Sequence, residues 1–210
     1  MTFDPAKHHR RSIRLKGYDY TRTGAYFVTI VAHNRQPFFG EILNGTIKNT
    51  KMGKILHREW ERLPRRFKNI HLDKFVIMPN HIHAILIIDN PSLTGNPPST
   101  TETLQGPELL PVSAISPARE SSPLPSTQSK PRPTGPRPGS LGAIIGQFKS
   151  GVTKQIWALG GPIGKSHAPI WQRNYYEHII RNDTELNHIR QYIIDNPLRW
   201  ADDVENPARR

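Results

Sequence analysis

A proline-rich segment in the middle of the chain limits what the chain can fold into. Twelve of the 20 prolines fall between residues 90 and 140, together with many Ser, Thr and Gly residues. Proline removes a backbone donor and fixes φ, and this segment has few large apolar side chains to bury. The sequence therefore predicts one domain in two halves, residues 1–89 and 141–200, joined by a disordered insertion over residues 90–140 and followed by a tail over residues 201–210.

Strand and helix signals alternate on both sides of the insertion. The predicted elements are, in order, a strand (25–33), a hairpin around Asn44-Gly45 (38–48), a helix ended by Pro64 (50–63), two strands (72–78 and 81–88), a helix (141–156), a strand (175–180) and a helix that begins after Asn182 and ends before Pro197. Residues 85–88 lack polar alternation, which favours a central strand covered on both faces. This order favours an α+β fold: a ferredoxin-like split β-α-β antiparallel sheet with helices on one face.

The charge of the chain points to a polyanionic partner. The formal net charge is +12, and a chain this basic is expected to bind nucleic acid, although a merely basic surface is the alternative. The absence of cysteine excludes disulfides, thiolate metal sites and cysteine nucleophiles. The longest apolar run, residues 84–88, is far too short to cross a bilayer, and no secretory signal is evident. The expected location is the cytoplasm, in association with the nucleoid.

His81 and His83 are the first candidate site residues. Alternate residues of a strand point to the same side, so two imidazoles two apart can converge on one metal ion while Ile82 faces the core. The spacing alone is weak, and two partly exposed histidines on a sheet face are the alternative.

The last predicted helix carries the second set. Tyr192 and Asn196 are four apart and share one face with His188. A tyrosine beside a cation is a plausible nucleophile for phosphoryl transfer, and Asn196 could supply a third ligand. Such a nitrogen and oxygen site suits Mg²⁺ or Mn²⁺. The alternative is that Tyr192 packs in the core and Asn196 caps the helix.

Basic residues interleaved with aromatic ones form the third feature. Single strands are bound by base stacking on aromatic rings and by phosphate neutralisation. The candidate nucleic-acid-binding residues are Arg11, Arg14, Lys16, Lys149, Lys154, Trp171 and Arg173. Trp171, like Tyr175 and Tyr176, is equally well explained as a core residue of a strand.

Taken together, these stretches resemble the REP-associated tyrosine transposases of the HUH superfamily, which use a single tyrosine. The matching stretches are residues 11–17, 25–30, 78–83 (MPNHIH), 148–150 (FKS), 171–173 (WQR) and 192–197 (YIIDNP), which lie in order on both sides of the insertion. The resemblance implies the split β-α-β fold, His81 and His83 as the paired histidines, and Tyr192, rather than Tyr175 or Tyr176, as the nucleophile. It also implies Asn196 as the polar residue that completes the metal site, where relatives often have Gln.

The function implied by the resemblance is metal-dependent cleavage and rejoining of single-stranded DNA beside hairpins of palindromic repeats, through a 5′-phosphotyrosine intermediate. One alternative is a protein of the same ancestry that binds DNA hairpins without cutting them. Another is a replication initiator or conjugative relaxase, but the short chain has no P-loop. The sequence leaves open whether the chain acts as a monomer or a homodimer.

Overall fold

The structure is a computed structural model that describes residue 15 and residues 17–90, 135–164 and 167–209. Most of the predicted insertion, residues 91–134, lies outside the described residues. So do three of the predicted nucleic-acid-binding residues, Arg11, Arg14 and Lys16.

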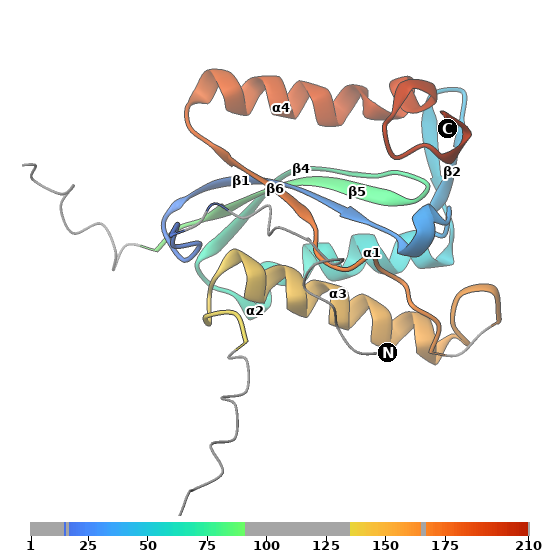
Figure 1. Ribbon diagram of the computed structural model, residues 1–210, viewed down its shortest axis with the longest axis horizontal. Helices are drawn as coiled ribbons and strands as arrows, with labels where there is room; N and C mark the ends of the chain where they lie inside the picture. Colours follow the sequence, from blue (N-terminus) through green and yellow to red (C-terminus); the bar gives the residue numbers. More distant parts are fainter. Residues whose placement is uncertain (1–14, 16, 91–134, 165–166, 210) are drawn as a thin grey trace, which may run out of the picture. The chain divides into compact units, whose positions relative to one another are not determined.

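Four strands form one antiparallel sheet. They are β1 (Gly24–Val31), β4 (Ile70–Ile77), β5 (His81–Ile88) and β6 (Tyr176–Ile180), in the spatial order β4-β5-β1-β6 (Figure 1). Each neighbouring pair is antiparallel. The two strands richest in apolar residues, β1 and β5, occupy the centre, where both faces are covered. The predicted α+β fold with a ferredoxin-like split β-α-β sheet is confirmed.

A separate hairpin precedes the first helix, as Asn44-Gly45 predicted. Strands β2 (Gly40–Leu43) and β3 (Thr46–Asn49) pair across these two residues. Asn44 has φ of 51° and Gly45 has φ of 71°. Positive φ at both central residues is typical of the type I′ turn, which Asn-Gly favours.

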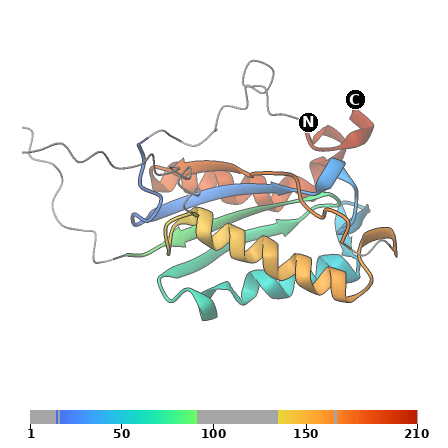
Figure 2. The same cartoon turned by 60° about the horizontal axis from the view of Figure 1, so that its bottom comes forward.

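Two long helices cover one face of the sheet, where they lie side by side (Figure 2). Helix α1 (Lys51–Glu61) is capped by Thr50, and α3 (Leu141–Ala158) is capped by Ser140. Pro64 lies within the first turn of the short helix α2 (Leu63–Arg66), a position that proline tolerates. Among the residues that the structure describes, no helix has the length and apolar character needed to span a membrane.

The last helix, α4 (Asp183–Asp195), lies on the opposite face of the sheet (Figure 1), which corrects the prediction that the helices share one face. The cause is β5, whose outward side also carries an apolar side chain, Ile85, that needs cover. Helix α4 provides this cover with Ile193, which is buried, and with Leu186 and Ile189, which are partly buried. Asn182 caps α4 as predicted. The short 3₁₀ turns are η1 (His33–Arg35), η3 (Pro162–Gly164), η4 (Asn196–Asp202) and η5 (Pro207–Arg209).

A β-bulge in β4 provides a polar contact between the sheet and α4. The register between β4 and β5 shifts between Leu72 and Phe75, so Asp73 and Lys74 form a bulge. A bulge changes the direction of a side chain, and Asp73 accepts two hydrogen bonds from Arg190 Nε of α4, at 3.1 and 3.0 Å.

Candidate active site

His81 and His83 lie at the start of β5, on the sheet face that α4 covers. Their Nε2 atoms are 2.9 Å apart. Ile82 between them is fully buried in the core of the opposite face. Only 0% and 4% of the surface of the two histidines is exposed. The structure thus brings the two rings together on a stiff central strand.

A hydrogen bond at Nδ1 fixes the orientation of each histidine ring, so that its Nε2 atom points toward the other histidine. His81 Nδ1 is 2.8 Å from the side-chain oxygen of Asn80, so Nδ1 carries the proton and Nε2 keeps its lone pair. His83 Nδ1 is 2.8 Å from the hydroxyl of Thr29, which can donate or accept. Burial lowers the pKa of His81 to about 3, which keeps its ring neutral at pH 7. A neutral ring held at Nδ1, as in His81, is well suited to bind a cation through Nε2.

A C-terminal segment, residues 196–206, brings a carboxylate to this pair, and we call it the C-terminal strap. Asp203 Oδ2 lies 3.7 Å from His81 Nε2 and 3.9 Å from His83 Nε2. Burial raises the pKa of Asp203, but the contacts with His83 and His81 outweigh it and hold that pKa below its ordinary value. The carboxylate is therefore ionised at neutral pH, and the three buried side chains could hold a metal ion.

Polar contacts fasten the far end of the strap. The Asn80 side-chain amide donates to the backbone carbonyls of Glu205, at 2.7 Å, and Arg35, at 3.1 Å. The Arg35 guanidinium also donates to the Glu205 carboxylate, at 2.5 Å. Asn80 is fully buried and accepts from His81 with its oxygen. One amide thus sets the orientation of a histidine and the position of the strap that carries Asp203.

Tyr192 approaches the pair from α4. Its hydroxyl is 3.3 Å from His83 Nε2, and 41% of its surface is exposed. Burial and the negative charge of Asp203 raise the pKa of Tyr192, while a hydrogen bond from Asn196 acts in the opposite direction. Without a cation the phenol is therefore protonated at neutral pH. It lies at the boundary between the buried pair and solvent.

Asn196 lies one helical turn after Tyr192, at the end of α4. Only 3% of its surface is exposed, and its side-chain oxygen has no hydrogen-bond partner within the described part of the chain. A buried acceptor without a partner costs about 1–3 kcal/mol. A cation bound at the histidine pair would give this oxygen a partner.

The donor set fits a hard divalent cation. The two imidazole Nε2 atoms lie 2.9 Å apart, and imidazole together with oxygen ligands suits cations such as Mg²⁺ and Mn²⁺. Oxygen donors are present in Asp203 and Asn196, and the chain has no thiolate to offer.

The predicted nucleic-acid-binding residues that the structure describes differ in exposure. Lys149 is half-buried and donates to two backbone carbonyls within residues 172–174, and burial lowers its pKa to about 8. Trp171 packs against the core and donates its indole N–H to the carbonyl of Lys149. These two side chains hold the loop after Trp171, whereas Lys154 and Arg173 are exposed to solvent.

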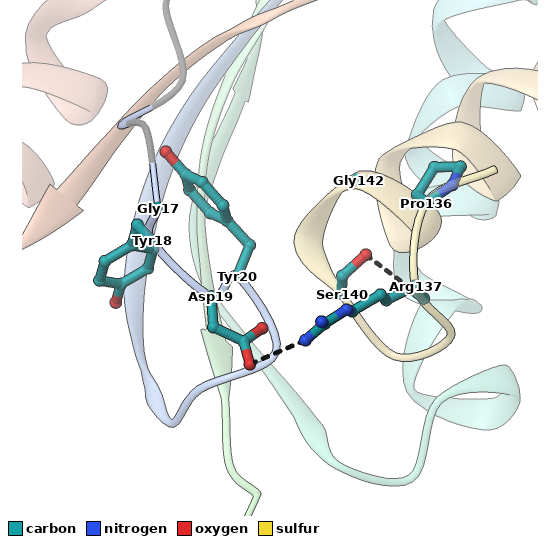
Figure 3. A pocket seen from close by; sticks show the side chains of 8 residues that line it. All are labelled: Gly17, Tyr18, Asp19, Tyr20, Pro136, Arg137, Ser140 and Gly142. Atoms are coloured by element: carbon teal, nitrogen blue, oxygen red, sulfur yellow. Dashed lines mark hydrogen bonds and ion pairs between the residues drawn. The ribbon is translucent and has the colours of Figure 1, made fainter. Parts of the chain in front are cut away.

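A hollow of about 290 Å³ lies at the other end of the sheet, between the segment before β1 and the start of α3 (Figure 3). Its wall carries an ion pair between Asp19 and Arg137, at 3.4 Å, and the capping hydroxyl of Ser140. The histidine pair starts β5, where His81 lies opposite Val31 at the end of β1. The hollow therefore contributes no residue to the candidate active site.

Three groups around the histidines were not predicted from the sequence: Thr29, Asn80 and Asp203. Asn80 directly precedes His81, so its proximity could have been inferred. Thr29 becomes a neighbour only through the pairing of β1 with β5. Asp203 has no sequence signal, because it falls in a polar stretch that was predicted to be a tail, and only the folding of the strap brings it to the histidines.

Fold and site together define an α+β protein with a buried His-His-Asp cluster on one sheet face and a helix-borne tyrosine beside it. A solved structure of a REP-associated tyrosine transposase bound to a REP hairpin is similar, with a TM-score of 0.50 and 16% sequence identity, covering 90% of this chain and 74% of that chain. At this identity the similarity shows the fold alone.

A closer relative establishes the family. The chain belongs to the same family as an uncharacterized protein from Haemophilus influenzae, with 37% identity over 196 residues, which cover 93% of this chain and 92% of that protein. No family model matches the chain.

Proposed function

We propose that this protein cleaves and rejoins single-stranded DNA, with Tyr192 as the nucleophile and a divalent cation, Mg²⁺ or Mn²⁺, bound at His81 and His83. The observation that carries the proposal is the 3.3 Å distance between the Tyr192 hydroxyl and His83 Nε2. The phenol thus lies beside the two nitrogens that would hold the cation.

His81 and His83 would bind the cation through Nε2, with Asp203 and the Asn196 side-chain oxygen as the oxygen ligands. Asn80 and Thr29 hold the two rings in the binding orientation. When bound, the cation would polarise the scissile phosphate and favour the phenolate form of a nearby tyrosine.

Cleavage is a transesterification at phosphorus. The Tyr192 oxygen forms a bond to the phosphorus and loses its proton to solvent. The bond from phosphorus to the 3′ oxygen breaks, and that oxygen takes up a proton. The product is a 5′-phosphotyrosine ester and a free 3′ hydroxyl. Attack of a 3′ hydroxyl on the ester reverses the step and rejoins the strand without ATP.

The substrate is proposed to be a single strand beside a hairpin of palindromic repeats. The fold similarity to a transposase bound to a REP hairpin supports this choice, and the net charge of +12 fits a polyanionic partner.

The test is a covalent adduct that survives denaturation. The full-length protein is incubated with labelled single strands that flank a hairpin, in the presence of Mn²⁺, and the mixture is run on a denaturing gel. We expect an adduct with the parent protein and with Tyr176→Phe, and none with Tyr192→Phe, which keeps its binding to the hairpin. An adduct of undiminished yield from Tyr192→Phe would reject the assignment. Hairpin binding without any adduct would favour the alternative of a non-cleaving DNA-binding protein.

A further inference from the structure

The aromatic run Trp171, Tyr175 and Tyr176 divides between the two faces of the sheet. Trp171 and Tyr175 pack against the core on the side of α1 and α3. Tyr176, the first residue of β6, keeps 50% of its surface exposed. The core therefore covers only part of the Tyr176 side chain.

Strand pairing puts Tyr176 in the same row as His83. Thr29 of β1 lies opposite His83 on one side and opposite Tyr176 on the other. Neighbouring strands are about 4.8 Å apart, so Tyr176 lies roughly 10 Å from His83 on the same face. The side chain between them, Thr29, is small and turned to His83 by a hydrogen bond.

Phe27 joins the exposed ring to the site. Its ring stacks on His83, with centroids 5.4 Å apart, and makes edge contacts with Tyr192 at 6.0 Å and Tyr176 at 6.2 Å. Phe27 itself is 9% exposed. Two half-exposed tyrosines thus flank one buried ring next to the histidine pair.

We infer that Tyr176 is the nucleobase-stacking residue of this site: an unpaired base of the DNA strand lies on its ring while the neighbouring phosphate reaches the histidine pair. The inference rests on the proposed function, since it names the group that would hold the strand there. Stacking on an aromatic ring needs an open base face, and a single strand offers one at every base, so the proposed occupant is a single strand. The exposed Arg173 and Arg181 precede and follow β6, and their charges suit the phosphates of such a strand.

The test measures DNA binding without cleavage, in a Tyr192→Phe background. A fluorescein-labelled single strand of about 12 nucleotides is titrated with the protein at fixed salt, since about 4 to 16 nucleotides form a typical single-strand site. We expect Tyr176→Ala to weaken binding about 5- to 100-fold, and Tyr176→Phe and Tyr176→Trp to keep it, because stacking needs the ring and not the hydroxyl. Leu159→Ala, which removes an exposed apolar side chain elsewhere, should have no effect.

Salt dependence separates stacking from charge. Tyr176→Ala should leave the slope of log affinity against log salt unchanged, whereas Arg173→Ala should reduce its magnitude by about 1. Unchanged affinity of Tyr176→Ala, or an equal loss in Tyr176→Phe, would overturn the inference. If the parent protein forms the adduct but Tyr176→Ala binds DNA with normal affinity, the stacking role is rejected and the proposed function stands. If Tyr176→Ala loses affinity but the parent protein forms no adduct, the proposed cleavage is rejected and the stacking role stands.

Discussion

The two faces of the sheet are held together by different forces. On the side of α1 and α3, the core is one continuous apolar cluster that includes Trp60, Leu86 and Phe148. On the side of α4, the described residues give a buried apolar cluster of four members, Phe27, Ile85, Ile180 and Ile193. Beside this cluster the same face carries the buried polar side chains of His81, His83, Asn196 and Asp203.

Strand β5 serves both faces by simple alternation. Ile82, Ala84 and Leu86 point into the large core, while His81 and His83 point to α4. Polar side chains on one side of a central strand are tolerated here because the other side buries enough apolar surface to hold the strand in place. One face therefore stabilises the fold and leaves the other available for chemistry.

The largest expected effect is on activity, from a change on the polar face. His83→Ala should slow adduct formation at least about 10³-fold, because it removes a proposed cation ligand and the neighbour of the Tyr192 hydroxyl. The free energy of unfolding should fall by less than about 2 kcal/mol, since the residue lies outside the large core. Denaturing gels and urea unfolding measure the two quantities. A loss of stability as large as that of a core truncation would break the contrast between the faces.

The next largest effect is on stability, and it comes from a residue of the same strand three positions after His83. Leu86→Ala removes a fully buried side chain of the large core and should cost about 3–5 kcal/mol of unfolding free energy. Adduct formation per folded molecule, measured well below the unfolding midpoint, should match the parent protein. A strong loss of activity in the folded fraction would mean that the two faces are coupled more tightly than their contacts indicate.

The fold was predictable because its signals are local. The apolar stripe of α3, the Asn-Gly turn and the caps at Thr50 and Asn182 each depend on residues close in sequence. The position of α4 was predicted wrongly, although residues 85–88 already indicated a strand covered on both faces. A second cover for β5 was implied, and α4 is the helix that supplies it.

The site was predictable only in part. The strand spacing of His81 and His83 and the helical spacing of Tyr192 and Asn196 mark candidates within single elements. The approach of Asp203 depends on the path of the strap, which is fixed by the hydrogen bonds of Asn80 to Glu205 and Arg35. No short-range pattern records such contacts.

A smaller effect is expected from removing the hydrogen bonds of the Asn80 side chain. Asn80→Ala removes the acceptor that orients His81 and the donor that holds Glu205, and should weaken Mn²⁺ binding about 10- to 100-fold. Isothermal titration of the full chain with Mn²⁺ measures the loss directly, without relying on cleavage. Asn187→Ala, on the exposed side of α4, is the control and should bind as the parent does. Equal affinities for both variants would mean that Asn80 only fills space.

The smallest effect concerns the attachment of α4 and its dependence on pH. The hydrogen bonds from Arg190 hold the pKa of Asp73 below its ordinary value. Stability from this pair is therefore fully present above the ordinary pKa of about 4 and is lost as pH falls through the lower pKa of the folded state. Asp73→Asn should cost about 1 kcal/mol at pH 7, because the pair is bidentate but partly exposed.

This difference between parent and Asp73→Asn should shrink as pH falls from about 4 toward 2, where the parent carboxyl is protonated too. Urea unfolding of both proteins across this range measures it, and Asp89→Asn, which changes an exposed carboxylate just after β5, serves as the control for general acid effects. The side of α1 and α3 has an acid-sensitive group of its own, because burial raises the pKa of Glu59 but contacts with Arg62 and Arg66 outweigh burial and hold that pKa below its ordinary value. Acid should therefore weaken both faces, and the shrinking difference between parent and Asp73→Asn isolates the part that holds α4. A constant difference down to pH 2 would show instead that the cost of Asp73→Asn does not come from the ion pair with Arg190.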